Sequence, residues 1–249
     1  MNGLKKNAAA IGRSLDIYYR DDERTHRMDR LNAAFVPKGG LAFDIGAHVG
    51  DRTASFLRLG ASAVALEPQP RVFRALKLIH GRTSKAVLLC QAAGAQPGEI
   101  TIHLNSNNPT VSTASQDLIT TAASTKEWKD QAWDSQIQVP VTTMDHLIAK
   151  HGAPDFVKID VEGHELHVLL GLSTPIPALS FEFTTIQRDV ALACINRLSE
   201  LARYEFNVSL GEEHVLRHQN WIGQSDLRDQ ITSFPDNVNS GDIYARHVL

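Results

Sequence analysis

The sequence predicts an α/β fold in which helices cover both faces of a mostly parallel sheet. Two apolar runs, 41–45 and 62–66, are each followed by a helical pattern, and strands continue to alternate with helices along the chain. Such alternation is typical of parallel strands joined through right-handed crossovers. The chain has 249 residues, 43% of them hydrophobic, so we expect a single domain, 1–249, with a sizeable core.

The first half of the chain begins with a segment outside this alternation. Residues 1–38 carry many charges around scattered apolar residues, which predicts an N-terminal helical extension, and Pro37-Lys-Gly-Gly40 breaks it. The elements expected after it are strand 41–45, helix 53–59, strand 62–67, helix 70–79, strand 87–93 and strand 98–104.

The second half contains two polar interruptions, 105–136 and 211–240. We predict that both are insertions that cover the substrate, and the alternative is that they are ordinary surface loops. The elements expected around them are a strand from Val139 that leads into a helix, strand 156–159, a helix that begins at Gly163 with Leu166, Leu169 and Leu170 inward, strand 179–183, helix 189–201, a short helix near 225–231, and strands 204–210 and 243–246.

A glycine turn follows the first strand of the predicted sheet. In Asp44-Ile-Gly-Ala-His-Val-Gly50, an acid ends the strand and Gly46 and Gly50 bracket the turn before a helix. This junction typically holds a ligand at the carboxyl end of a parallel sheet. Asp44 would oppose a pyrophosphate, and the G-x-x-x-G spacing is not the dinucleotide fingerprint. The turn therefore favours S-adenosylmethionine, whose ammonium and sulfonium a nearby carboxylate attracts.

A second acid ends the next predicted strand. Glu67 lies 23 residues after Asp44, close to the spacing of about 20 at which an acid meets ribose hydroxyls in nucleotide folds. Pro68 stops this strand, and we expect Gln91 and Ala92, at the end of the third strand, beside the adenine. The alternative is that Asp44 caps a helix and that Glu67 is a solvated strand end.

Composition limits the cellular compartment and the kinds of binding partner that we expect. The net charge is −3, which gives no reason to expect a nucleic-acid partner. Cys90 and Cys194 lie in apolar stretches and are expected to be free thiols in a reducing compartment. We find no signal-peptide pattern and no membrane-spanning run, so we expect a cytoplasmic protein without a membrane partner. Self-association into a homo-oligomer is compatible with the sequence.

Three motifs together resemble the FkbM-type methyltransferase family. They are Asp44-Ile-Gly-Ala-His-Val-Gly50, Glu67-Pro68 and Lys158-Ile-Asp-Val-Glu-Gly-His-Glu165. The resemblance covers about residues 40 to 185. It implies a Rossmann-like, seven-stranded class I methyltransferase sheet with one antiparallel strand near the edge. It also implies transfer of methyl from S-adenosylmethionine, with S-adenosylhomocysteine as product, mostly to oxygen on sugars and on antibiotic or polyketide intermediates.

One residue departs from the family pattern. His48 stands in the glycine turn where the resemblance leads us to expect Asn, and it is assigned a contact near the amino-acid end of the cofactor. Asp160, at the end of strand 156–159, is also predicted to contact the cofactor because it lies beside the methyl group.

The predicted catalytic residues come from the last motif and from the strand after it. An alcohol acceptor must lose its proton, and a positioned carboxylate or histidine can remove it. We expect Asp160 or His164 to act as the base, with Glu162 and Glu182 orienting substrate or base. The alternative is that Glu162 caps helix amides and His164 is simply exposed. Lys158, inside an apolar strand, is expected to pair with a carboxylate or to extend its amine to solvent.

Asp160, Glu162 and Glu182 could offer oxygen ligands to Mg²⁺, but the sequence does not fix their geometry, so no metal is predicted. The expected partner is a small hydroxylated acceptor. Two other functions are compatible with such a sheet, namely a nucleotide-dependent oxidoreductase and a non-catalytic protein that binds S-adenosylmethionine.

Overall fold

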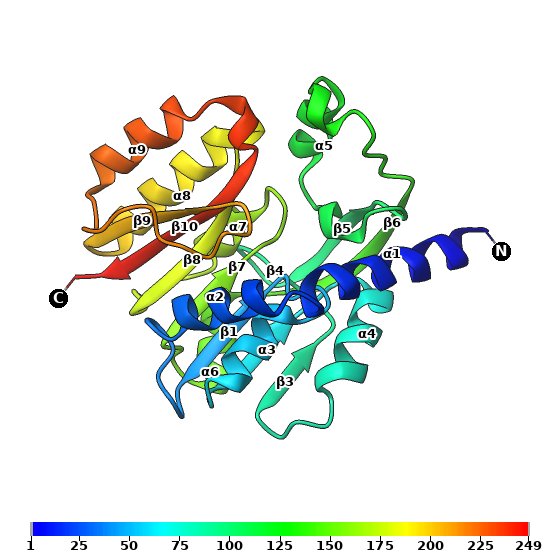
Figure 1. Ribbon diagram of the computed structural model, residues 1–249, viewed down its shortest axis with the longest axis horizontal. Helices are drawn as coiled ribbons and strands as arrows, with labels where there is room; N and C mark the ends of the chain where they lie inside the picture. The colour runs from blue at the N-terminus through cyan, green and yellow to red at the C-terminus, as the bar shows by residue number, and fades with distance from the viewer. Residues whose placement is uncertain (1, 249) are drawn as a thin grey trace.

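The computed structural model describes residues 2–248, and their strands form two sheets (Figure 1). The strands are β1 (Leu41–Ile45), β2 (Ser62–Leu66), β3 (Ala86–Leu89), β4 (Ala92–Ala93), β5 (Gly98–Leu104), β6 (Ser135–Thr142), β7 (Phe156–Ile159), β8 (Ala178–Thr184), β9 (Tyr204–Leu210) and β10 (Ser240–His247). The main sheet has seven strands in the order β3-β2-β1-β7-β8-β10-β9, and β4, β6 and β5 form a smaller sheet.

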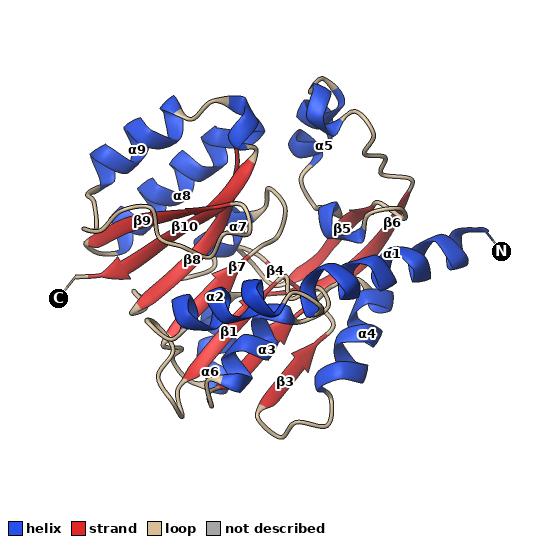
Figure 2. Cartoon of the chain, viewed as in Figure 1, coloured by secondary structure: helices blue, strands red, loops and turns tan. Residues whose placement is uncertain are grey.

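Helices lie on both sides of the main sheet (Figure 2). They are α1 (Asn2–Tyr19), α2 (Asp22–Asn32), α3 (Asp51–Arg58), α4 (Pro70–His80), α5 (Gln116–Ala123), α6 (Met144–His151), α7 (Glu165–Leu170), α8 (Arg188–Leu201) and α9 (Gln224–Ser233), with short 3₁₀ turns η1 (Pro109–Val111), η2 (Lys126–Trp128), η3 (Thr185–Gln187) and η4 (Asp236–Val238). In the described part of the chain, no helix is both long and apolar enough to cross a membrane.

Strand direction in the main sheet confirms the predicted fold class. The strands β3, β2, β1, β7 and β8 run parallel, whereas β10 runs antiparallel to both β8 and β9. This is the seven-stranded sheet with one antiparallel strand near the edge that the motifs imply.

Alternate side chains of each strand point to opposite faces of the main sheet and pack in two different hydrophobic cores. Phe43 and Ile45 of β1 pack with α6, α7, α8 and α9 in the larger core. Ala42 belongs to the core on the opposite face, beneath α2 and α3, and α4 packs beside it. Asp44 shares this second face with Ala42, so it points away from the larger core.

Strand register gathers charged side chains on this second face. Lys158 of β7 lies beside Asp44 of β1, and Asp242 of β10 lies beside Glu182 of β8. Asp160 follows Lys158 by two residues and therefore points to the same side. Residues from four strands thus converge at the carboxyl end of the sheet.

Three details differ from the sequence prediction. The run 87–93 is not one strand, because the chain leaves the main sheet after β3 and β4 pairs with β6 instead. The strand expected from Val139 begins at Ser135, where it pairs with the end of β5. Leu170, expected to face inward, is 47% exposed at the last position of α7, whereas Leu169 is fully buried.

The glycine turn after β1 makes a close contact with the end of β7. Gly46 has a φ of 87°, a left-handed conformation that favours glycine. A Cβ on Gly46 would lie only 1.7 Å from the backbone oxygen of Asp160. Glycine is therefore required here for the turn and the predicted catalytic strand end to lie side by side.

We expect Gly46→Ala to lower the free energy of unfolding by about 3 kcal/mol or more, since it combines overpacking against backbone with an unfavourable φ. Urea unfolding followed by circular dichroism measures this. Gly12→Ala is the matched control, because a Cβ there meets nothing within 4 Å, and it should stabilise helix α1 slightly. Equal stability of Gly46→Ala and the wild-type protein would contradict the close contact.

Candidate functional site

A cavity of about 600 Å³ opens at the carboxyl ends of β1, β2, β7 and β8. Nearly all of the residues predicted for cofactor and catalysis line it. They are Asp44, Gly46, His48, Glu67, Pro68, Gln91, Ala92, Asp160, Glu162, His164 and Glu182. Gly50 is the exception among the predicted residues. It lies behind the turn at a φ of 86°, packed against Leu76 and His80, and so shapes the turn without facing the cavity.

Glu67 is held rigidly at the end of β2. Its two carboxylate oxygens accept hydrogen bonds from the backbone N–H groups of His48, at 3.1 Å, and Gln69, at 2.7 Å. Burial raises the pKa of Glu67 to about 7. Each oxygen keeps capacity for a further donor, so the carboxylate can accept hydrogen bonds from a ligand diol.

Asp44 lies at the bottom of the cavity and is 1% exposed. The hydroxyl of Thr53 donates a hydrogen bond of 2.5 Å to its carboxylate. Burial raises the pKa of Asp44 to about 6. Asp44 and Glu67 end neighbouring strands, β1 and β2, as the sequence predicts.

His48 has a φ of 48°, unusual for a residue other than glycine. Its ring meets the ring of Tyr18 edge-on, with centroids 6.1 Å apart, and burial lowers the pKa of His48 to about 4. The imidazole is therefore neutral at physiological pH. Tyr18 of α1 also lines the cavity, and no sequence motif predicted this contribution.

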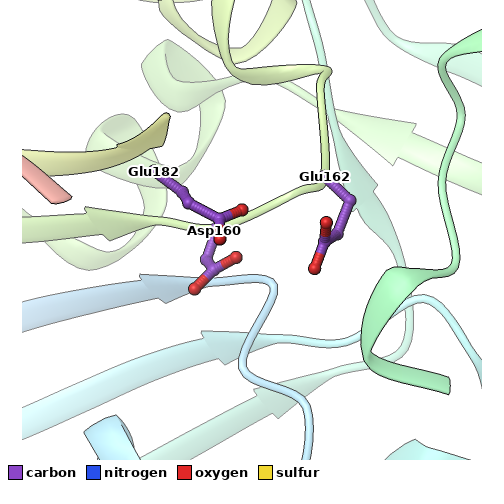
Figure 3. A group of neighbouring side chains, drawn as sticks. All are labelled: Asp160, Glu162 and Glu182. Carbon is purple, nitrogen blue, oxygen red and sulfur yellow. The ribbon is translucent and has the colours of Figure 1, made fainter. Parts of the chain in front are cut away.

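Three carboxylates meet in the cavity at the ends of β7 and β8 (Figure 3). Asp160 follows β7, Glu162 lies in the turn after it, and Glu182 projects from β8. One carboxylate oxygen from each lies within 4.8 Å of the others. Burial and repulsion from neighbouring acids raise the pKa values of Glu162 and Glu182 well above their usual range.

Lys158 pairs with carboxylates and does not extend to solvent, which settles the two alternatives left by the sequence. The lysine is 2% exposed, and its amine forms ion pairs with Asp242 and, at 3.3 Å, with Asp160. Burial alone would lower the pKa of Lys158, but these two acids raise it above its usual value. The ammonium is thus a fixed positive charge under the acid cluster.

The turn that carries Glu162 is held by another acid, Glu165, which sequence reasoning did not single out. Its carboxylate accepts hydrogen bonds of 3.1 Å from the backbone N–H groups of Val161 and Gly163. These amides lie in the turn before α7, so Glu165 braces the turn, and no side chain among the described residues caps the amides of α7, Glu162 included. The Glu162 side chain is left to face the cavity.

His164 lies immediately before α7 and lines the cavity. Its ring stacks on that of His167, with centroids 4.1 Å apart. Burial and the neighbouring imidazole lower the pKa of His164 to about 4, so it is neutral near pH 7. A neutral imidazole can accept a proton, although the low pKa makes it a weak base.

Both polar insertions contribute to the cavity wall. The segment 105–136, which folds into η1, α5 and η2, supplies Asn108 and Trp128, and the segment 211–240 supplies Glu212 and Asn239. The indole N–H of Trp128 donates a hydrogen bond of 3.2 Å to the side-chain oxygen of Asn239. This bond joins the two insertions across the cavity.

An ion-pair network that is largely buried, except for a Glu212 side chain that is 49% exposed, ties the N-terminal helices to the same wall. Arg24 of α2 donates to Asp51, at 2.8 Å, and to Glu212, at 2.5 Å. Arg52 pairs with the same two acids, at 2.9 and 3.3 Å. The pKa of Glu212 is held well below its usual value because the attraction of Arg52 and Arg24 outweighs its burial.

Comparison with known proteins decides the family. A family model described as the methyltransferase FkbM domain matches residues 44–216, more than half of the chain and all of the predicted site residues. This chain belongs to the FkbM methyltransferase family. A search of curated proteins gives no match.

Solved structures add evidence on the fold of this FkbM methyltransferase. A TehB-like SAM-dependent methyltransferase from Corynebacterium glutamicum matches with a TM-score of 0.50 and 9% identity, over 100% of each chain. At that identity the likeness shows the fold alone. Precorrin-6y C5,15-methyltransferase from Geobacter metallireducens matches with a TM-score of 0.47 and 11% identity, over 89% of this chain and 86% of that one. An O-methyltransferase from Bacillus cereus in complex with SAH matches with a TM-score of 0.43 and 14% identity, over 99% and 89%.

As an FkbM methyltransferase, the protein uses S-adenosylmethionine as methyl donor. The glycine turn fits this cofactor and not a dinucleotide, since the N–H of His48 is already engaged by the Glu67 carboxylate. A pyrophosphate there would meet that carboxylate, whereas a ribose diol and an ammonium would be attracted to the two acids. The oxidoreductase alternative is therefore wrong.

We expect Glu67→Gln to weaken binding of S-adenosylmethionine by about 10- to 100-fold, because hydrogen bonds to a charged group contribute about 1.5–3 kcal/mol. Isothermal titration calorimetry measures the affinity. The pKa of Glu67 is about 7, so its carboxylate becomes more populated as the pH rises. Wild-type affinity should therefore increase between about pH 6 and about pH 8.

In Glu67→Gln this pH dependence should be much smaller. Glu200→Gln, which changes a side chain of α8 that is 67% exposed, is the matched control and should bind as the wild-type protein does. Unchanged affinity in Glu67→Gln would contradict the assignment of this residue to the cofactor.

Proposed function

We propose that this FkbM methyltransferase transfers methyl to a hydroxyl oxygen of a small molecule, such as a sugar or a polyketide or other natural-product intermediate. One observation carries the proposal. A single cavity runs from the two acids predicted to bind the cofactor, Asp44 and Glu67, to the carboxylates of Asp160, Glu162 and Glu182. Groups able to take a proton thus face the acceptor end of the methyl donor's site.

The size and enclosure of the cavity support a small acceptor. Its volume of about 600 Å³ lies in the usual range of small-molecule sites. The two insertions that line it, 105–136 and 211–240, are joined through Trp128 and Asn239, which supports their proposed role as substrate covers. A net charge of −3 gives no electrostatic support for a nucleic-acid acceptor.

When bound, S-adenosylmethionine supplies an electrophilic methyl group on its sulfonium. The residues of the protein hold the acceptor oxygen in line with the carbon–sulfur bond, and this positioning supplies much of the rate. Asp160 or His164 takes the hydroxyl proton as the oxygen–carbon bond forms and the carbon–sulfur bond breaks. Glu162 and Glu182 orient the acceptor or the base. The products are a methyl ether, S-adenosylhomocysteine and a protonated base.

Two geometric features support these roles. Asp160 lies 3.3 Å from the Lys158 amine and its backbone packs against Gly46, which supports a position beside the proposed cofactor site. His164 is neutral near pH 7 and faces the same cavity, so it can accept a proton.

Transfer to oxygen can be tested with S-adenosylmethionine that carries a trideuterated methyl group. We expect the protein, offered a panel of sugars, phenols and aliphatic alcohols, to yield a deuterated methyl ether and S-adenosylhomocysteine, both measured by mass spectrometry. A matched panel of amines and thiols is the control. Methylation of nitrogen or sulfur alone would contradict the proposal. Cofactor binding without turnover of any acceptor from the native host would favour a non-catalytic binding protein.

On an accepted hydroxyl substrate, we expect loss of the general base to lower kcat by about 10²- to 10⁴-fold. The variants Asp160→Asn and His164→Ala identify the base, because only the residue that takes the proton should show the full loss. Calorimetric affinity for S-adenosylmethionine separates a catalytic defect from a binding defect. If both variants transfer methyl at the wild-type rate, the assignment of the base is wrong.

A further inference from the structure

Full ionisation of the acid cluster at the acceptor end of the cavity would place more negative charge there than its surroundings neutralise. Among the described residues, neither the Glu162 nor the Glu182 carboxylate has a hydrogen bond or an ion pair. The nearby cation, Lys158, is already paired with Asp242 and Asp160. These acids are partly buried in the cavity wall, so water screens their mutual repulsion less than it would on an open surface.

The spacing of the cluster suits a single bound ion. Protein oxygens lie about 2.0–2.6 Å from Mg²⁺ or Ca²⁺, so two ligands of one ion are never more than about 5 Å apart. The three carboxylate oxygens all lie within 4.8 Å of one another. They project toward a shared space from β7, the following turn and β8 (Figure 3).

A fourth oxygen points independently to a ligand at this place. Thr184 lies two residues after Glu182 on β8 and therefore on the same face of the strand. It lines the cavity, is only 7% exposed, and its hydroxyl forms no hydrogen bond with any residue that the structure describes. Its oxygen is not one of the side-chain atoms that are both fully buried and without a partner, so the hydroxyl is open to the cavity. The ion, or a water bound to it, would be its partner there.

We propose that Asp160, Glu162 and Glu182 bind one divalent cation of the Mg²⁺ class beside the position of the transferred methyl. Ligands made only of oxygen select Mg²⁺, Ca²⁺ or Mn²⁺ over softer metals. A dication neutralises the cluster more completely than a single ammonium group of an acceptor would. This inference extends the sequence prediction, which assigned no metal to these residues.

The inference deepens the proposed function, on which its catalytic part rests. An ion held by three protein ligands keeps coordination positions for water or for the acceptor. Contact with the ion would lower the pKa of an acceptor hydroxyl and fix its oxygen near the methyl group. Binding of the ion itself does not depend on which acceptor is methylated.

Binding of Mn²⁺ to the full-length protein tests the site directly, because free Mn²⁺ is measured by electron paramagnetic resonance. We expect one Mn²⁺ per chain, displaced by Mg²⁺. Glu182→Gln and Glu162→Gln should each weaken this binding by at least about 10-fold, since each removes a charged ligand. Glu200→Gln, remote from the cavity, should leave it unchanged.

Thermal unfolding is the second readout and reports whether the variants fold. Mg²⁺ should raise the Tm of the wild-type protein and of Glu200→Gln, but not that of Glu182→Gln. No stoichiometric Mn²⁺ binding at millimolar concentration, or equal binding in the cluster variants and the control, would overturn the inference. Binding of methylammonium in place of Mn²⁺ would also overturn it and assign the cluster to a cationic acceptor.

Failure of this inference can be told apart from failure of the proposed function. If Mn²⁺ binds as expected but methyl is never transferred to oxygen, the ion site stands and the proposed function is wrong. If methyl is transferred to oxygen at an unchanged rate after chelation with EDTA, and Mn²⁺ does not bind, the ion site is wrong and the proposed function stands.

Discussion

The buried ammonium of Lys158 is the interaction on which the rest of the site depends. A lone charge in the protein interior is strongly unfavourable, so the lysine requires the carboxylates of Asp242 and Asp160. These partners come from β10 and β7, with β8 lying between those strands. The ion pairs therefore hold three strands in one arrangement at the carboxyl end. They also occupy the Lys158 ammonium, which leaves the carboxyl groups of Glu162 and Glu182 without an ion-pair partner among the described residues.

Backbone packing joins the half of the site proposed for the cofactor to the half proposed for the acceptor. Gly46 lies so close to the Asp160 carbonyl that no side chain fits between them, and the glycine turn is anchored by hydrogen bonds from Gly46 and Ala47 to the carbonyl of Leu66. A methyl transfer needs nucleophile, carbon and sulfur in line, and errors of about 1 Å are costly. In the proposed mechanism the strand ends would set this alignment, and the longer segments form the cavity walls around them.

The short motifs were enough to predict the main strands of the fold and the site residues at the ends of those strands. These residues either lie near one another in the sequence or end adjacent strands. Glu67 and Asp160 are examples. Residues brought from a distance could not be predicted in this way. Tyr18, Glu212 and Asp242 reach the site from segments without any motif, through helix packing and strand order. The run 87–93 was predicted as one strand because its apolar pattern does not reveal where the chain changes sheets.

The short connection from Asn239 to Asp242 links the wall of the cavity to the ion pair of Lys158. Asn239, at a φ of 63°, accepts the hydrogen bond from Trp128, and three residues later Asp242 pairs with Lys158 in the middle of the sheet. The backbone of Asn239 is held separately, because its carbonyl accepts a hydrogen bond of 2.7 Å from the N–H of Thr185. An arriving molecule can therefore break the side-chain contact between Trp128 and Asn239 while β10 stays paired with β8 and the ion pair between Asp242 and Lys158 stays in place.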